Sequence, residues 1–399
     1  MTITAPAPPT STPEPTTLTA LDLFAGVGWA VACQRLGIHE RGVEISDVVV
    51  RTRDAAGLET IYGDVWDGLL GVHGVGRYDL LIGSPPCQTF SAAGSRSGSK
   101  ALAEVLSAIV DGLYRDPVAL HALTETLDPR TALVLTPLAH VYRDRPMFVV
   151  LEQVPPVLPV WEACATVMRD LGYSVVTELL NAEQYGVPQT RKRAILVGRR
   201  DGVEARMPTP THSRYYPRDP QRLDDGVLPW VSMASALGWS EGIVRSAQSI
   251  AGAGRAERAT EEPAFTVTQT SSRVLRSNYG TGGDPGARGE RPDVSPAPTI
   301  TSKAGRNQWV RPEVEPWPQS DRPATVIQGD PRVPLRKHHS RESPQMDGAL
   351  RLTQAEAAAL QSFPDGFPFQ GGLGERFLTI GNAVPPLLGQ AVLAVAVAT

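Results

Sequence analysis

The residues best suited to chemistry are those of the run Ser84-Pro85-Pro86-Cys87, which follows an apolar stretch ending at Ile82 and Gly83. Two prolines fix φ and remove two backbone donors, so they present the Cys87 side chain with little conformational freedom. A thiolate attacks electron-poor carbon, and prior positioning removes part of the entropic barrier to that attack. An isolated cysteine is more often a small buried hydrophobe. Cys87 is therefore a candidate nucleophile whose assignment depends on the remaining motifs.

A second group of residues could bind a nucleoside. Phe24 precedes a turn that contains Gly26 and Gly28, and glycine lets the backbone approach a ligand at the following helix N-terminus. Glu44 ends the next predicted strand, where a carboxylate can accept both hydroxyls of a ribose. Asp64 ends the third and could accept from an exocyclic amine. No phosphate-binding lysine accompanies them, which favours S-adenosylmethionine over a nucleoside triphosphate; an ordinary dinucleotide fold is the alternative.

The elements that position these residues alternate between strands and helices from Thr19 to about Arg200. This alternation predicts an α/β fold, a Rossmann-like, doubly wound and mostly parallel sheet with ligands at the carboxyl ends of its strands. Helices are expected at Ala30–Leu36 and Trp161–Leu171. The predicted strands are Ala20–Phe24, Gly42–Ile45, Thr60–Tyr62, Tyr78–Ile82, Met147–Leu151, Ser174–Leu179 and Ala194–Val197.

The regular pattern stops between Met207 and Gln345, where Pro, Gly, Arg and Ser dominate. A weak repeat in this region predicts related short strands or hairpins, although edge strands without a ligand role fit equally well. Its copies are Pro263–Thr268, Pro296–Thr301 and Pro323–Ile327. A capping box of Thr353 and Glu356 then predicts a helix through Ala357–Gln361.

Four regions follow from this pattern. Residues 1–19 form a disordered Pro/Thr-rich tail, and residues 20–206 form a cofactor-binding catalytic domain with an insertion at about 95–127. Residues 207–345 form an inserted, irregular, β-rich domain. Residues 346–399 return to the catalytic domain.

Charge is distributed unevenly between these regions. The chain has a net charge of −4. Residues 185–345 carry 24 Lys and Arg against 17 Asp and Glu, whereas the rest carries 14 against 25. A basic module on an acidic core is typical of a DNA-facing domain on an enzyme, although basic residues also solvate loop-rich regions.

Cysteine spacing and hydropathy limit the other classes of protein. Cys33, Cys87 and Cys164 show no CxxC spacing, which argues against a zinc site or a disulfide framework and fits a reducing cytoplasm. The first residues lack the basic and apolar parts of a signal peptide. The apolar stretch Leu387–Ala398 is too short to span a bilayer. We therefore expect a cytoplasmic protein with no metal and no membrane partner.

Taken in chain order, the motifs resemble those of the DNA cytosine-5 methyltransferase family, of bacterial or phage type. The resemblance covers both ends of the chain, and its force lies in the joint occurrence and order of motifs that are individually weak. The matching segments are Phe24–Gly28, Glu44, Asp64, Pro85–Gln88, Glu152–Val154, Gln189–Arg193 and Gly381–Pro385.

The resemblance implies a class I S-adenosylmethionine-dependent methyltransferase and gives each matching residue a role. Cys87 would be the nucleophile, and Glu152 would hold the Watson–Crick edge of the target base. Arg191 and Arg193 would anchor that base and order the cysteine loop. A structural ion pair is the alternative for Glu152 and the arginines, and a simple turn is the alternative for Asn382. The cofactor-binding residues would be Phe24, Gly26, Gly28, Glu44, Asp64, Pro86 and Asn382.

The chemistry requires this set. Attack of the Cys87 thiolate on carbon 6 of cytosine makes carbon 5 able to accept a methyl group. A carboxylic acid such as Glu152 stabilises that intermediate at ring nitrogen 3, and an arginine opposite the carbonyl oxygen adds charge stabilisation. The base must leave the stacked duplex first, at a cost of a few kcal/mol.

Three features depart from the family pattern. Gln153 stands where Asn is usual, and Trp29 replaces the usual small residue after the glycine turn. Trp29 would either narrow the cofactor mouth or pack the helix start. Extra sequence separates Gly94 from Asp128, which we interpret as a helical excursion, and an Asp-x-Arg element appears late at Asp128–Arg130.

The leading hypothesis is a site-specific enzyme that makes 5-methylcytosine in double-stranded DNA and reads sequence with residues 207–345. Such an enzyme would act as a monomer, with or without a cognate restriction endonuclease. One alternative is a transfer RNA cytosine-5 methyltransferase; another is a DNA-binding homologue that has lost catalysis. An NAD-dependent oxidoreductase is set aside because the turn lacks a third glycine.

Overall fold

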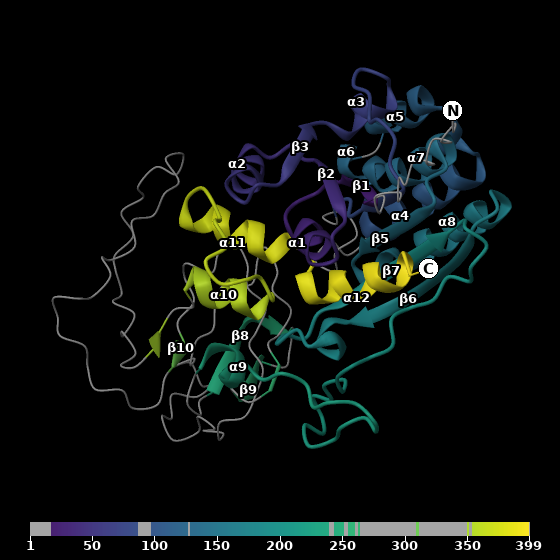
Figure 1. The fold of residues 1–399 in the computed structure, drawn as a ribbon. Coiled ribbons are helices and arrows are strands. Elements are labelled where there is room, and N and C mark those ends of the chain that lie inside the picture. The colour runs from purple at the N-terminus through teal and green to yellow at the C-terminus, as the bar shows by residue number, and fades with distance from the viewer. Residues whose placement is uncertain are drawn as a thin grey trace, which may run out of the picture.

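A seven-stranded sheet forms the centre of the protein, in the strand order β3-β2-β1-β4-β5-β7-β6 (Figure 1). The computed structural model describes residues 17–86, 97–126, 128–238, 243–250, 254–259, 262–263, 309–310, 349–350 and 353–398. The strands of the sheet are β1 (Thr19–Leu23), β2 (His39–Val43), β3 (Glu59–Tyr62), β4 (Leu80–Gly83), β5 (Phe148–Gln153), β6 (Ser174–Asn181) and β7 (Lys192–Arg199).

Strands β1 to β5 are parallel to one another, whereas β7 is antiparallel to both of its neighbours, β5 and β6. The register pairs Gln153 with Ala194 and Glu152 with Ile195. Reversal of β7 therefore brings its amino end to the edge where the parallel strands have their carboxyl ends. This confirms the predicted doubly wound, mostly parallel sheet, and all seven predicted strands overlap observed ones.

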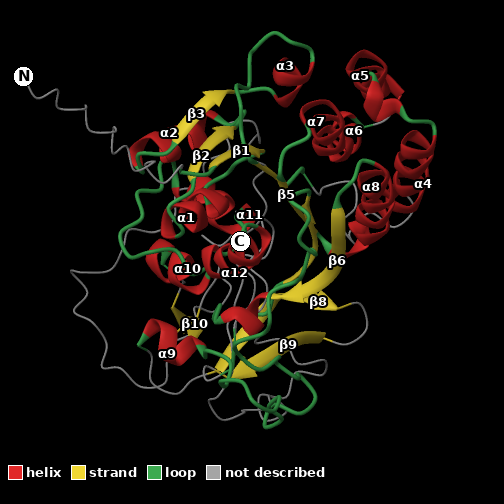
Figure 2. Ribbon diagram, turned by 45° about the vertical axis from the view of Figure 1, so that its right-hand side comes forward, coloured by secondary structure: helices red, strands yellow, loops and turns green. Residues whose placement is uncertain are grey.

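Helices cover both faces of the sheet (Figure 2). The residues of β4 show the division, because Leu80 and Ile82 pack with α1 and α12 while Leu81 packs on the other face with α7 and α8. The helices are α1 (Gly28–Arg35), α2 (Asp47–Ala55), α3 (Val65–Leu69), α4 (Ser97–Val110), α5 (Pro117–Thr126), α6 (Pro129–Ala132), α7 (Thr136–Asp144), α8 (Leu158–Asp170), α9 (Met233–Leu237), α10 (Gln354–Leu360), α11 (Leu373–Asn382) and α12 (Pro386–Ala396).

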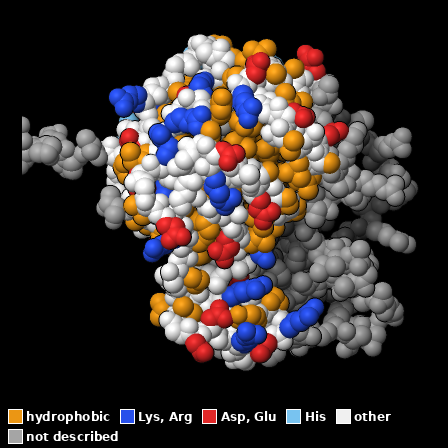
Figure 3. Space-filling model, turned by 90° about the vertical axis from the view of Figure 1, so that its right-hand side faces the viewer, with side chains coloured by type: hydrophobic (Ala, Val, Ile, Leu, Met, Phe, Trp, Pro, Cys, Tyr) orange, Lys and Arg blue, Asp and Glu red, His pale blue; other side chains and the backbone are white. Residues whose placement is uncertain are grey.

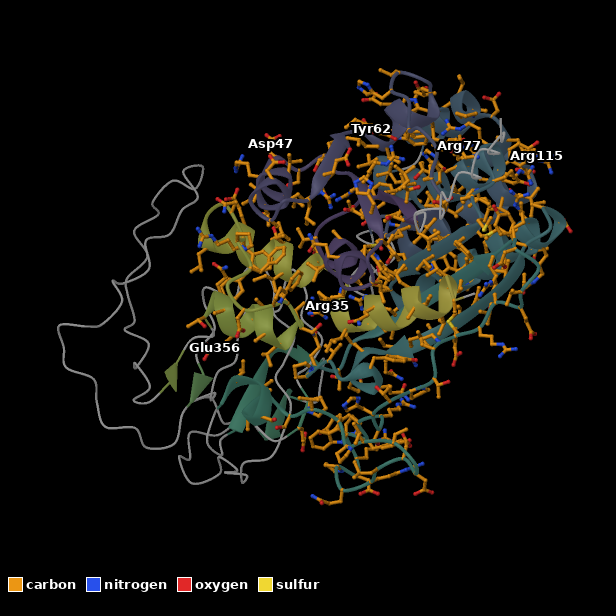
Figure 4. The ribbon with its side chains drawn as sticks, viewed as in Figure 1. Arg35, Asp47, Tyr62, Arg77, Arg115 and Glu356 are labelled. Atoms are coloured by element: carbon orange, nitrogen blue, oxygen red, sulfur yellow. The ribbon has the colours of Figure 1, made fainter. Side chains whose placement is uncertain are left out.

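The last part of the chain returns to the first. Helix α12 packs against α1 and the sheet, and α10 and α11 bury Phe363, Phe377 and Ile380 against the other side of α1. Arg35 on α1 donates from Nη2 to the Ser362 carbonyl oxygen (3.2 Å), where α1 meets the C-terminal helices (Figure 4). The capping box of Thr353 and α10 is present, as predicted.

The region between Gly94 and Asp128 is helical where the structure describes it. Helix α4 contributes Val105, Ala108 and Ile109 to the same core as α8, and α5 contributes Leu120. The predicted excursion is therefore helical in its described part, and these helices pack into the same core as α8. Charges of both signs are interspersed among apolar side chains on the described residues of the face in Figure 3.

The described part of residues 207–345 is smaller. It contains α9 and the antiparallel pair β8 (Ile243–Ile250) and β9 (Gly254–Ala259), together with β10 (Trp309–Val310), which pairs with β11 (Ala349–Leu350). Nearly all of the predicted three-copy repeat lies outside the described residues, as do residues 1–16.

One stretch, Leu373–Ala396, has the length (24 residues) and mean hydropathy (1.4) of a membrane span. It is not a single rod, because α11 ends at Asn382 and α12 begins at Pro386. Its apolar 18-residue window is 61% buried inside the protein, as in the core helices of a globular domain.

A partly buried polar cluster lies at the end of α7, away from the carboxyl edge of the sheet. Asp144 accepts hydrogen bonds from Tyr78 Oη (2.6 Å) and Arg143 Nε (2.6 Å) and pairs with His140 Nδ1 (3.1 Å). Burial alone would raise the pKa of Asp144, but the hydrogen bonds of His140, Arg143 and Tyr78 outweigh it and hold that pKa well below its usual range.

We expect replacement of the Asp144 carboxylate to cause a pH-dependent loss of stability. Because the folded pKa of Asp144 is depressed, its contribution is present above the unfolded pKa of about 3.9 and is lost as pH falls below it. Asp144→Asn should lower the free energy of unfolding at pH 7 by about 1.5–3 kcal/mol. Urea denaturation should show this deficit shrinking from pH 5 to pH 3. The exposed Asp111→Asn serves as control, and a deficit independent of pH would contradict the assignment.

Candidate active site

The carboxyl edge of the sheet gathers most of the residues that the sequence singles out. Phe24, Glu44 and Asp64 follow β1, β2 and β3, and the turn that begins at Ser84 follows β4. Glu152 lies near the end of β5. Because parallel strands share one carboxyl edge, sequence positions far apart meet there.

The turn after β1 has the backbone of a ligand cradle. Phe24 (φ 60°) and Gly26 (φ 52°) are both in the left-handed region, which is rare for a residue such as Phe. Glu44 Oε2 accepts from the Gly26 N–H (3.0 Å), and its Oε1 accepts from the Ser46 N–H (2.8 Å). The carboxylate thus ties two loops together, and each of its oxygens keeps a second lone pair for a hydroxyl group.

Gly28 is explained by the C-terminal segment. A Cβ at Gly28 would lie 2.1 Å from the Val384 carbonyl oxygen. The missing side chain therefore lets residues 381–384 approach the turn. Asn382, at the end of α11, is exposed there, so its amide is accessible beside the turn.

A buried arginine, Arg53, hydrogen-bonds to the backbone of the same turn. Arg53 on α2 is fully buried; its Nη1 donates to the Gly26 carbonyl oxygen (2.9 Å), and its Nη2 donates to both carboxylate oxygens of Glu40 (2.9 and 3.0 Å). Asp22 on β1 is also fully buried. Burial, then the neighbouring Glu40, raise the pKa of Asp22 well above its usual value, which favours the neutral acid.

The third strand end carries Asp64, which caps α3 by accepting from the Trp66 N–H through Oδ1 (3.0 Å). Ile45, directly after Glu44, is 72% exposed. An exposed aliphatic side chain next to a carboxylate can pack against the apolar face of a bound group. Ile45, Asp64 and Glu44 therefore suit a ligand with a flat ring and hydroxyl groups.

The turn after β4 is held from three directions. The Ser84 N–H donates to the Leu23 carbonyl oxygen (3.3 Å), and Trp29 Nε1 donates to Ser84 Oγ (2.8 Å). Gln153 Nε2 donates to the Pro85 carbonyl oxygen (2.6 Å). Pro86 is the last residue of this turn that the structure describes, and Cys87 lies outside the described residues.

Glu152 and Arg193 form an ion pair at this edge. Arg193 Nε lies 2.7 Å from Glu152 Oε1, and the two side chains are only 10% and 9% exposed. The pairing fits both of the readings made from the sequence, a structural ion pair and a base-binding acid with its arginine. Its position beside Gln153, which contacts the Pro85 carbonyl, links it to the turn after β4.

Arg191 turns toward the C-terminal segment. Its Nη1 donates to the Gly381 carbonyl oxygen (3.0 Å), in a buried setting. Gln189, two residues earlier, donates to the Leu360 carbonyl oxygen (2.9 Å) and to Gln361 Oε1. In the motif of residues 189–193, Gln189 and Arg191 therefore contact the C-terminal segment, whereas Arg193 pairs with Glu152.

We expect the side-chain amide of Gln153 to contribute measurably to the stability of the turn after β4. Gln153→Leu keeps the volume but leaves the Pro85 carbonyl oxygen without this donor, in a buried place. We expect the free energy of unfolding to fall by about 1–3 kcal/mol in urea denaturation. The exposed Gln34→Leu on α1 is the matched control, and equal stability of the two variants would count against the contact.

Sequence reasoning missed Asp22, Arg53 and Ile45. Arg53 belongs to a helix whose other arginine, Arg51, is exposed, so no pattern marked it as buried. The only signal for Asp22 was a carboxylate in the middle of an apolar strand. The sequence predicts Ile45 as the end of a strand, whereas the structure exposes its side chain.

The family model for C-5 cytosine-specific DNA methylase matches residues 18–110 and 122–397. A curated relative, the type II methyltransferase M1.HphI of Haemophilus parahaemolyticus, is 27% identical over 388 residues, which cover 94% of this chain and 85% of the relative. The type II methyltransferase M.SacI of Streptomyces achromogenes is 28% identical over 322 residues, covering 79% and 70%.

Solved structures share the fold at low identity. The methyltransferase EhMeth of Entamoeba histolytica has a TM-score of 0.53 at 13% identity, over 96% of this chain and 98% of that one. The Dnmt2 methyltransferase of S. pombe has a TM-score of 0.51 at 14% identity, over 94% and 97%. The family match leaves out residues 111–121, so α4 lies within it.

Proposed function

Since this chain belongs to the C-5 cytosine-specific DNA methylase family and is a DNA cytosine-5 methyltransferase, we propose that it modifies one cytosine of a specific duplex site through a covalent bond to Cys87. The observation that carries this proposal is the pairing of Glu152 with Arg193 next to the turn that leads to Cys87. Gln153 joins the two by its 2.6 Å hydrogen bond to Pro85.

The donor site fits S-adenosylmethionine. Phe24, Gly26, Glu44 and Asp64 would hold its adenosine, and Glu44 has the two-oxygen geometry that two ribose hydroxyls need. Because Gly28 lets the C-terminal segment approach, Asn382 would complete the pocket, and Pro86 would line it. When bound, the cofactor supplies a methyl group on a positively charged sulfur.

The protein's own residues carry the rest of the reaction. The Cys87 thiolate forms a bond to carbon 6 of a flipped-out cytosine, and the electrons of the 5,6 double bond move to carbon 5. Glu152 hydrogen-bonds ring nitrogen 3, while Arg193 and Arg191 favour the developing negative charge. After carbon 5 is methylated and loses its proton, the sulfur–carbon bond breaks and the thiolate leaves.

The biological role follows from the relatives and from charge. M1.HphI and M.SacI are named type II methyltransferases, which supports a modification role alongside a restriction endonuclease. The net positive charge of residues 207–345, which carry 18 Lys and Arg against 15 Asp and Glu, supports a DNA-reading role for them. We propose a cytoplasmic monomer of bacterial or phage origin, and double-stranded DNA as its substrate.

A trapping experiment tests the proposal. Purified protein, S-adenosylmethionine and random-sequence duplex DNA that contains 5-fluorocytosine should give an adduct that survives a denaturing gel, because fluorine cannot leave carbon 5 as a proton does. Sequencing of the trapped DNA should give the recognition site. Cys87→Ser should form no adduct.

Three outcomes would redirect the assignment. Methyl transfer by Cys87→Ser at the wild-type rate would exclude the covalent mechanism. Methyl transfer to total RNA and none to duplex DNA would move the substrate to RNA. Cofactor binding without any transfer would indicate a protein that has lost catalysis.

A further inference from the structure

Trp29 is the residue at which the glycine turn departs from the family pattern, and the structure buries it. The side chain is 1% exposed. Its indole N–H donates to Ser84 Oγ at 2.8 Å. This bond joins the first turn of α1 to the residue that opens Ser84-Pro85-Pro86-Cys87.

The indole ring packs against α12 at a position where that helix has a glycine. Gly389 of α12 faces it, and a Cβ at Gly389 would lie 3.2 Å from Trp29 Cε3 and 3.4 Å from Cζ3. The Cβ of Ala32 would lie 3.1 Å from the same added atom. The ring therefore packs close to the backbone of α12 at a position without a side chain, and its N–H bonds to Ser84 at the carboxyl end of β4.

The turn that begins at Ser84 has few hydrogen-bonding groups that can hold it in place. Pro85 and Pro86 have no backbone N–H to donate, so the turn is fixed by contacts at Ser84 and at the Pro85 carbonyl. Trp29 supplies the bond to the Ser84 side chain, while Gln153 and Leu23 hold the backbone. Since φ is fixed at both prolines, a displacement of Ser84 passes along the chain toward residue 87.

We propose that Trp29 is a positioning residue for methyl transfer, acting through Ser84 to set where the catalytic turn begins relative to the cofactor turn. The inference rests on the proposed function, in which Cys87 is the nucleophile. It resolves the two readings of Trp29 made from the sequence: the indole packs inside the helix layer and does not narrow the cofactor mouth. Because the Trp29 side chain is buried, its contribution is geometric.

Removal of either partner of the bond provides the test. Trp29→Phe removes the donor and Ser84→Ala removes the acceptor, whereas Ser84→Thr keeps a hydroxyl. Steady-state kinetics on duplex DNA should show kcat lowered by roughly tenfold to 10²-fold in the first two variants. The affinity for S-adenosylmethionine, measured by calorimetry, should stay at the wild-type value. The double variant should lose no more than the worse single one.

A matched control separates positioning from stability. Tyr173→Phe removes another buried hydrogen bond, from Tyr173 Oη to the Pro146 carbonyl oxygen (2.5 Å), at the opposite edge of the sheet. Its kcat should be unchanged at a similar loss of stability. Ser84→Ala retains the indole, so it tests the proposal even where Trp29→Phe folds poorly.

A cofactor-free measurement adds an independent readout. Iodoacetamide should modify Cys87 selectively, because Cys33 and Cys164 are buried, and burial raises the pKa of the Cys164 thiol to about 12. The rate at Cys87 should change in the same direction in Trp29→Phe and Ser84→Ala, and stay constant in Tyr173→Phe.

Two results would overturn the inference. One is a wild-type kcat in Trp29→Phe and Ser84→Ala; the other is a kcat loss that follows a loss of cofactor affinity. Failure of the proposed function is recognised separately, because Cys87→Ser would then remain active in the same assay.

Discussion

Replacing Glu152 by glutamine is expected to lower kcat for DNA methylation by about 10²–10⁴-fold, with the affinity for S-adenosylmethionine unchanged. Glutamine has nearly the same shape, but it can neither donate an acidic proton to ring nitrogen 3 nor carry the charge that pairs with Arg193. The measurement is single-turnover methyl transfer to duplex DNA that carries the recognition site, with calorimetry for the cofactor.

The control for this variant is Glu178→Gln. Glu178 lies on β6 and faces the same Ile195 of β7 as Glu152 does, yet it is exposed. Its kcat should equal that of the wild type. A Glu152→Gln enzyme with kcat within about twofold of the wild type would remove Glu152 from the chemistry.

The ion pair between Glu152 and Arg193 also contributes to stability, and this contribution must be measured separately from its effect on catalysis. Loss of one partner of a fully buried pair costs about 3–5 kcal/mol, and this pair, at 9% and 10% exposure, should cost less. Combining Glu152→Gln with Arg193→Met should restore part of the stability. It should restore no activity, because the acid is still missing.

Adding one methyl group at Gly28 is expected to disrupt the cofactor site by displacing α1 or residues 381–384. The Cβ of Gly28→Ala would overlap the Val384 carbonyl oxygen at 2.1 Å and approach the Val384 nitrogen at 2.9 Å. Backbone atoms cannot rotate away, so either α1 or residues 381–384 must shift. We expect a loss of about 1–3 kcal/mol or more in urea denaturation. Calorimetry should show at least about a tenfold loss of S-adenosylmethionine affinity, equivalent to about 1.4 kcal/mol.

Gly74→Ala is the control for this prediction. Gly74 has no heavy atom within 4 Å of an added Cβ and no left-handed φ, so the substitution should be neutral. Cofactor affinity preserved in Gly28→Ala, together with wild-type stability, would show that the segment around Val384 is not needed to close the pocket.

Most of the sheet could be predicted because its signals are local. Apolar runs such as those around Leu81 and Val149 recur between turn residues, and the motif residues follow the strand ends directly. Strand β2 was predicted to begin at Gly42, but it begins at His39. The polar residue Glu40 breaks the apolar pattern in the first half of that strand. Only the structure shows that its carboxylate is buried against Arg53.

The contacts that shape the site could not be predicted, because they join residues far apart in the sequence. The Gly28 contact with Val384 and the Arg191 contact with Gly381 depend on how the C-terminal segment returns. The bond of Trp29 to Ser84 depends on a glycine of α12. No local pattern encodes such pairings, whereas the family motifs identified the residues without giving their partners.

The return of the last helices to the first has a consequence for biosynthesis. Arg35 bonds to Ser362, 327 residues later in the chain. At about 5–20 residues per second, a ribosome needs roughly a quarter of a minute to a minute to make that stretch. Until then the apolar face of α1 lacks α10, α11 and α12, and Gly28 lacks Val384. The turn at Gly28 therefore gains its packing against Val384 only after residue 384 has been made, and nascent chains are the form most exposed to chaperones and proteases.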